Sequence, residues 1–140
     1  MVIVDLNVLV YAVNRDALRH EPSRVWLERA LAGPETVGLP WLVLLGFLRL
    51  STARTIGVNL PLATALAVVK GWIDQPVTSV LEPTGRHLDH LATLLQVAGM
   101  GGNLVQDAHL AALAIEHRAT VVSFDRDFDR FPGVRRSEPS

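Results

Sequence analysis

Hydrophobic and polar positions alternate along the chain between two kinds of pattern. Short apolar segments, typical of buried strands, occupy residues 2–4, 35–40, 77–82 and 119–125, and another short strand is expected after residue 130. Segments with helical periodicity separate them: from about residue 8 to 13, 22–32, 41–52, 61–74, 86–97 and 104–117. This alternation predicts an α/β fold, a three-layer α/β/α sandwich with a central parallel sheet, in one domain over residues 1–140.

Composition narrows the class of protein. Of the 140 residues, 49% are hydrophobic, yet no segment reaches the roughly 18 uninterrupted apolar residues that span a membrane. The apolar N-terminus is interrupted by Asp5 and has no preceding basic residue, so it is a poor signal peptide. The chain has no cysteine, and we expect a cytoplasmic protein with no membrane partner. A net charge of -1 provides no strong overall attraction for nucleic acid.

Three aspartates are the candidate chemical groups. Asp5 and Asp125 each end a predicted strand, and Asp107 lies near the start of an apolar helix, on its buried face. Two of them have an ordinary structural interpretation: Asp107 interacts favourably with its helix dipole, and Asp125 begins a turn or caps a helix. Parallel neighbouring strands, however, would bring the carboxylates to the sheet edge where ligands bind.

Three converging carboxylates repel one another unless a proton, a basic group or a cation compensates them. Sequence neighbours offer no such basic partner, so a hard cation such as Mg²⁺ or Mn²⁺ is the expected compensation. A cation held this way activates water and stabilises in-line displacement at phosphorus. His87 and His90, three apart on one predicted helix, lack a third metal ligand, and we expect them at the surface.

Three segments together resemble a known family. "VIVDLNVLVYA", "NLVQDAHLAALA" and "VVSFDRDFDRFPG" occur in the order and at the spacing of PIN-domain ribonucleases, and are most similar to VapC toxins of bacterial toxin–antitoxin pairs. The resemblance covers nearly the whole chain. It implies a PIN-like fold and a metal-dependent endoribonuclease toxin of a type II system. It also implies a homodimer inhibited by a cognate VapB-type antitoxin.

The resemblance also assigns residues. It implies that Asp5, Asp107 and Asp125 hold the metal and are catalytic, with Asn7 and Ser123 as hydrogen-bonding support. The family has a fourth acidic residue, a glutamate in an "E-F-L-R"-like stretch. This chain reads "G-F-L-R", with Gly46 at that position, so its activity is expected to be impaired.

Several alternatives stay open from the sequence. Gly46, in the middle of an apolar helix, is also typical of close helix packing. The chain is alternatively a catalytically inactive PIN-like module that binds RNA or an antitoxin. An aspartyl phosphotransferase of the haloacid-dehalogenase kind begins with the same strand-Asp-x-Asn pattern, but it needs a lysine, and Lys70 is the only one. Candidate phosphate contacts are Arg49, Arg126 and Arg130, although such arginines are often only ion-pair partners.

Overall fold

The computed structural model describes residues 1–54 and 58–140 and contains a five-stranded sheet. Its strands are β1 (Val2–Val4), β2 (Val37–Gly38), β3 (Thr78–Ser79), β4 (Thr120–Val122) and β5 (Arg135–Ser137). They are ordered β3-β2-β1-β4-β5, and every neighbouring pair is parallel. β1 is central, with Ile3 opposite Gly38 on one side and Val121 on the other. The predicted parallel sheet is confirmed.

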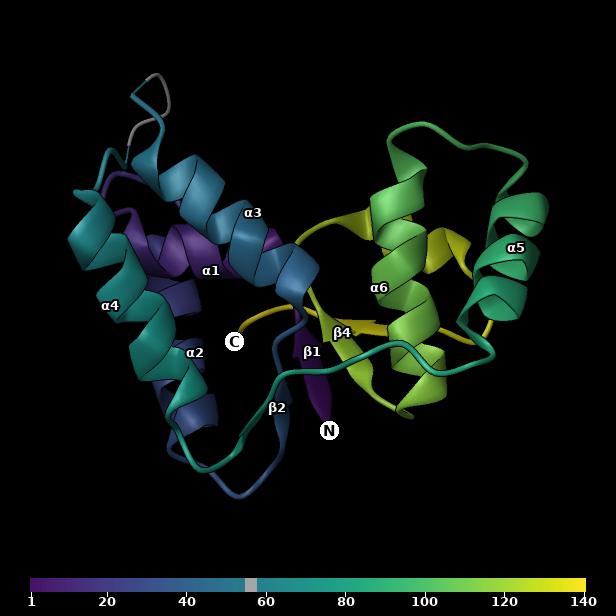
Figure 1. Ribbon diagram of the computed structural model, residues 1–140, viewed down its shortest axis with the longest axis horizontal. Coiled ribbons are helices and arrows are strands. Elements are labelled where there is room, and N and C mark those ends of the chain that lie inside the picture. Colours follow the sequence, from purple (N-terminus) through teal and green to yellow (C-terminus); the bar gives the residue numbers. More distant parts are fainter. Residues whose placement is uncertain (55–57) are drawn as a thin grey trace.

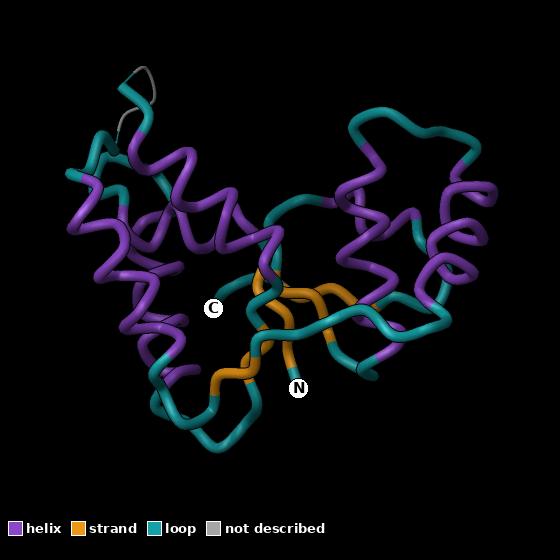
Figure 2. Tube along the Cα trace, in the orientation of Figure 1, coloured by secondary structure: helices purple, strands orange, loops and turns teal. Residues whose placement is uncertain are grey.

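Helices cover both faces of this sheet. Those on one side are α1 (Leu6–Val13), α2 (His20–Leu31), α3 (Trp41–Thr52) and α4 (Leu62–Ile73); those on the other are α5 (His87–Ala98), α6 (Leu104–Glu116) and the short 3₁₀ helix η1 (Arg126–Arg130) (Figure 1). The tube view shows the strands as a thin middle layer between the two groups (Figure 2). The expected α/β/α sandwich is therefore confirmed. None of the described helices has the length and apolar character needed to cross a membrane.

Local chemistry explains where these helices begin. The Asp5 side chain accepts a hydrogen bond from the Leu6 amide and caps α1. Pro40 and Pro61 precede α3 and α4, in the extended backbone that starts a helix. The prediction that α2 begins at Pro22 is wrong by two residues, because α2 starts at His20 and a proline is tolerated in the first helical turn.

A hydrogen-bonded chain of side chains joins α5 to α6. His87 Nδ1 lies 2.7 Å from Glu116 Oε2, and His87 Nε2 lies 2.8 Å from His109 Nδ1. Thr84 donates to the other oxygen of Glu116. The side chain of His87 is only 14% exposed, so the expectation of a surface histidine is wrong here. No local pattern indicates that His109, 22 positions further along the chain, contacts His87.

Candidate active site

The aspartates lie where the order of the strands reverses. Asp5 follows β1 directly, and Asp125 follows β4 after Ser123 and Phe124. β2 and β4 lie on opposite sides of β1, which makes the carboxyl end of β1 a topological switch point of the kind that binds ligands in open α/β sheets. Asp107, in the first turn of α6, reaches the same edge from the helical layer.

Asp5 is buried and held by three donors. Its Oδ1 accepts from the Leu6 amide at 2.7 Å, while its Oδ2 accepts from Ser123 Oγ at 2.6 Å and from Asn7 Nδ2 at 3.0 Å. Ser123 Oγ in turn accepts from the Asp125 amide at 2.9 Å. Burial raises the pKa of Asp5 above its usual value, and the charge of Asp125 adds to this, whereas the hydrogen bonds from Ser123 and Leu6 oppose it. Asn7 and Ser123 therefore connect the acids that follow β1 and β4.

A second group of carboxylates lies beside Asp5. Asp107, Asp125 and Asp127 each place one carboxylate oxygen within 4.8 Å of the other two. Asp5 is not in that group of three. Sequence reasoning overlooked Asp127, although its signal was present as the second aspartate of "DRD". Asp125 also accepts a hydrogen bond from the Asp127 amide at 2.8 Å, so the capping role that the sequence left open exists together with the clustering.

The electrostatics of this group favour a cation. Desolvation, followed in importance by the charges of Asp5, Asp125 and Asp127, raises the pKa of Asp107 to about 7. Carboxylate oxygens that are partly buried and close together are the donor set that Mg²⁺ and Mn²⁺ take in proteins. The residues present therefore fit a divalent metal ion.

Gly46 lies in the middle of α3, facing this site. It lines a cavity of about 280 Å³ together with Asp5 and Asp107. A Cβ atom built on Gly46 would lie 2.8 Å from Cδ2 of Leu6, so Leu6 packs directly against the glycine. The geometry is therefore consistent with both ideas that the sequence raised: an open position beside the acids, and a glycine that permits close packing.

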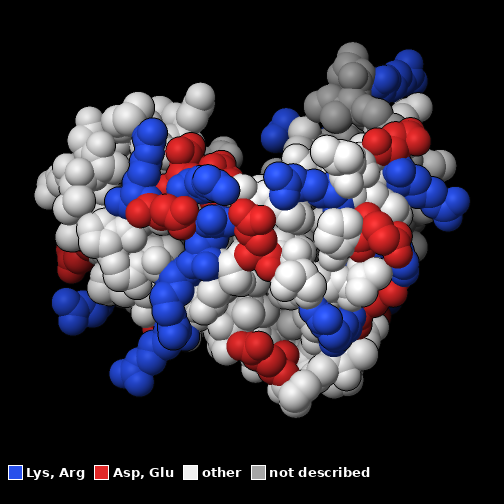
Figure 3. All heavy atoms as spheres, turned by 180° about the vertical axis from the view of Figure 1, so that it is seen from behind, with Lys and Arg blue, Asp and Glu red and all other residues white. Residues whose placement is uncertain are grey.

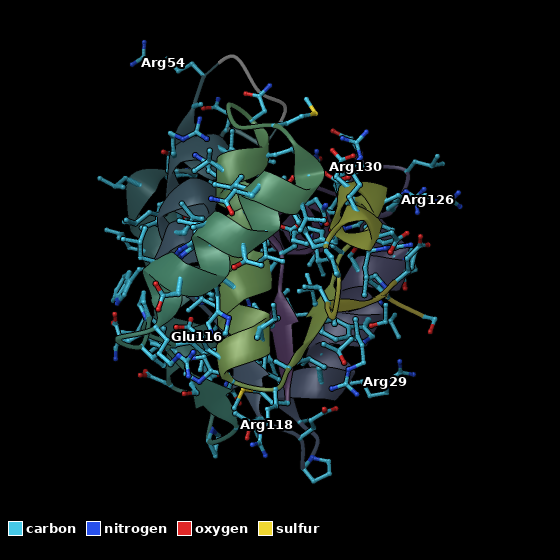
Figure 4. All side chains as sticks on the ribbon, turned by 90° about the vertical axis from the view of Figure 1, so that its right-hand side faces the viewer. Arg29, Arg54, Glu116, Arg118, Arg126 and Arg130 are labelled. Carbon is cyan, nitrogen blue, oxygen red and sulfur yellow. The ribbon has the colours of Figure 1, made fainter. Side chains whose placement is uncertain are left out.

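The three candidate arginines differ in position. Arg49 is exposed on α3 and lines the same cavity as Asp5 and Asp107. Arg130 lines a depression with Asp107, Asp125 and Asp127, and its Nε lies 3.5 Å from Asp127 Oδ1. Arg126 is exposed at the start of η1 and extends away from the helix (Figure 4). On the face shown in Figure 3, acidic and basic side chains are interspersed rather than separated into one basic patch.

The lysine that a phosphotransferase requires is not at this site. Lys70 is exposed on α4 and its Nζ lies 2.8 Å from Asp74 Oδ2. It lines none of the cavities that contain Asp5. The geometry therefore disfavours the phosphotransferase alternative.

Comparisons with known proteins agree with this geometry. The family model of the PIN domain matches residues 2–134. The chain is 50% identical over 140 residues to ribonuclease VapC37 of Mycobacterium tuberculosis, an alignment that covers 99% of this chain and 97% of the relative. It is 41% identical to ribonuclease VapC25 of the same organism, with 99% of both chains covered.

Solved structures have the same fold. VapBC2 of Rickettsia felis, bound to a DNA fragment from its promoter, superposes with a TM-score of 0.74 at 20% identity and full coverage of both chains. The sarcin-ricin loop cleaving toxin VapC20 of Mycobacterium tuberculosis superposes with a TM-score of 0.69 at 19% identity, covering 96% of this chain and 99% of that one. From the family match and the sequence identities, the chain belongs to the PIN domain family, among the VapC ribonucleases.

Proposed function

We propose that this protein is a metal-dependent endoribonuclease, the toxin of a type II toxin–antitoxin pair. The observation that carries the proposal is the convergence of Asp5, Asp107, Asp125 and Asp127 at the switch point of the sheet. The relatives named as ribonucleases support the choice of RNA as the substrate.

Each acid has a part in this proposal. Asp107 and Asp125, with Asp127 beside them, hold the cation, and Asp5 completes the negative centre from β1. A divalent ion bound there supplies Lewis-acid chemistry for water and phosphate oxygens. Ser123 and Asn7 fix the orientation of the Asp5 carboxylate, and Ser123 ties it to the backbone of Asp125. In this proposal the scissile phosphate would lie at the carboxyl end of β1, beside these acids.

Gly46 is the observation behind a second candidate function, a module without catalytic activity. If the missing fourth acid is indispensable, the chain is a module that binds RNA or an antitoxin and cuts nothing. The position of Gly46 in the cavity wall beside Asp5 and Asp107 favours retaining this alternative. The two functions predict the same partners and differ in catalysis.

A cleavage assay separates them. Purified protein is incubated with total cellular RNA in Mg²⁺ or Mn²⁺ and in chelator, and new 5′ ends are mapped by sequencing. We expect metal-dependent cuts, and we expect Asp125→Asn to abolish them. Asp16 is an exposed acid elsewhere on the chain, so the matched control Asp16→Asn should still make these cuts. If the protein binds RNA in the presence of metal but leaves it intact, the chain is the non-catalytic module.

Partners and assembly form the rest of the proposal. Solved neighbours are VapBC complexes, which supports a VapB-type antitoxin as partner. Trp41 on α3 and Leu62 and Leu66 on the adjacent α4 are large apolar side chains left exposed, as at surfaces that an interface covers. We expect a homodimer, and sedimentation of the chain with and without its antitoxin tests both parts.

A further inference from the structure

A cleft between α3 and α6 adjoins the acidic centre. Its volume is about 280 Å³, near the lower limit of small-molecule sites, which suits one ring system rather than a whole ligand. Figure 1 shows the two helices on either side of the strand ends. The residues that line it are Asp5, Leu6, Leu42, Val43, Leu45, Gly46, Arg49, Gln106, Asp107 and Leu110.

The walls of this cleft combine apolar side chains with four charged or polar ones. Leu6, Leu42 and Leu45 line it from one side and Leu110 of α6 from the other. Apart from the two aspartates, Arg49 and Gln106 are its polar side chains. Both are exposed, and no hydrogen bond or ion pair within the described residues engages either side chain. A cleft that has leucines on two sides and free donors is suited to a ring with a polar edge.

We propose that the α3–α6 cleft binds one unpaired nucleobase of the RNA strand whose phosphate lies at the acidic centre. This inference rests on the proposed function. Proteins read single-stranded RNA by enclosing a splayed base between side chains and hydrogen-bonding its edge. Leucines on both sides contact the faces of the ring, while Arg49 and Gln106 reach its edge.

The donors indicate which base fits. Arginine is a donor only, and its planar fork pairs with the two acceptors, O6 and N7, of guanine. Gln106 offers both a donor and an acceptor, so it adds contact without excluding guanine. Guanine is therefore the expected occupant.

Gly46 lies in the wall of the cleft, against Leu6. A Cβ atom built at this position would lie 2.8 Å from Leu6 Cδ2, so the glycine lets Leu6 pack there as part of the same wall. The alternative role for Arg49, a contact to phosphate, needs only its charge and makes no use of the apolar walls.

Mononucleotides test the inference without any cleavage. We would titrate ¹⁵N-labelled protein in Mg²⁺ with guanosine 5′-monophosphate and with ribose 5-phosphate, which has the same phosphate and sugar but no base. We expect the nucleotide to bind about fivefold or more tightly, from the usual worth of one base-edge contact. It should also shift the amide resonances of Gly46, Gln106 and Leu110. Because no bond is cut, the result is independent of whether the chain is a nuclease.

Variants of Arg49 separate base reading from phosphate binding. Arg49→Lys keeps the positive charge and loses the planar fork, so it should lose most of the preference for the nucleotide over ribose 5-phosphate. Arg54→Ala, which removes a charge just past the end of α3 and outside the cleft, should keep it. Equal affinities for guanosine 5′-monophosphate and ribose 5-phosphate would overturn the inference. Changes of amide resonances only at residues outside the cleft would overturn it too. Full retention of the preference in Arg49→Lys would contradict the role of Arg49.

Discussion

Gly46→Glu is the substitution that most directly probes the acidic centre. It places a carboxylate at the position where the sequence predicts that the fourth acid of the family is missing. Gly46 lies in the wall of the cavity that contains Asp5 and Asp107, so the new side chain enters the same space. We expect a less stable protein in chelator and a more active one in metal.

The magnitude in chelator follows from three contributions. Replacing a mid-helix glycine stabilises α3 by somewhat under about 1 kcal/mol. The new Cβ lies 2.8 Å from Leu6 Cδ2, and moving that flexible side chain costs about 0.5–1.5 kcal/mol. A further negative charge roughly 6 Å from another costs about 3 kcal/mol at an effective dielectric constant of 20, and less where Asp107 is protonated. With Asp107 ionised, the sum is a destabilisation of about 2.5–3.5 kcal/mol, or a Tm lower by roughly 8–12 °C, and both are smaller where Asp107 is protonated.

Metal reverses this loss. Loss of a residue that merely supports a ligand typically reduces metal affinity or activity by about 10- to 100-fold, so a restored carboxylate should give at least that gain. A tenfold tighter site adds about 1.4 kcal/mol of stability at saturating metal, because only the native state binds. The assays are melting curves in chelator and in Mn²⁺ with a parallel measurement of RNA cleavage.

Gly46→Gln is the matched control, since it has the same shape without the charge. It should reproduce the displacement of Leu6 and none of the gain in metal affinity or cleavage. If Gly46→Glu folds but neither binds metal more tightly nor cuts RNA faster than Gly46→Gln, the missing-acid hypothesis is wrong. Gly46 is then a packing glycine against Leu6.

The remaining predictions concern the other residues of the centre. The pKa of Asp107 is raised from 3.8 to about 7, so between these pH values the native state binds more protons than the unfolded state. The free energy of unfolding in chelator therefore falls as the pH rises from about 4 to about 7. Asp107→Asn should therefore raise the Tm in chelator at pH 8 and change it little near pH 4, and an equal shift at both would contradict the assignment. Ser123→Ala removes one of the three donors to Asp5 and leaves the Asp125 amide without its hydrogen-bond acceptor; we expect a loss of about 1–3 kcal/mol in denaturant unfolding and weaker metal binding by calorimetry. Mg²⁺ or Mn²⁺ should raise the Tm of the parent chain, and a similar rise in Asp125→Asn would count against a metal centre here.

Much of the fold could be predicted because its signals are local. Pro40 and Pro61 mark the starts of α3 and α4, and apolar runs ending in polar residues mark β1 and β4. Strand order and register are set by packing between distant segments, so periodicity alone predicted a parallel sheet but not the order β3-β2-β1-β4-β5.

In the candidate site, too, only the residues marked by a local signal could be predicted from the sequence. Asp5 and Asp125 could be predicted because each follows a strand. Asp127 was overlooked because its contact with Asp107 depends on how η1 turns back toward α6, which no local pattern encodes. The packing of Leu6 on Gly46 likewise depends on the angle at which α1 meets α3.

The place of β1 in the sheet has a consequence for synthesis. β1 is made first, yet one of its two neighbours is β4, and the hydrogen bond from Ser123 to Asp5 spans 118 positions of sequence. At bacterial-scale elongation of about 5–20 residues per second, Asp5 waits roughly 6–24 s for that partner to be made. Until then Asp5 has neither Ser123 nor Asp125 beside it, and Asp107 itself is made only shortly before them. A chain that ends before β4 lacks Asp125 and Asp127, so it cannot form the group of carboxylates that these two residues make with Asp107.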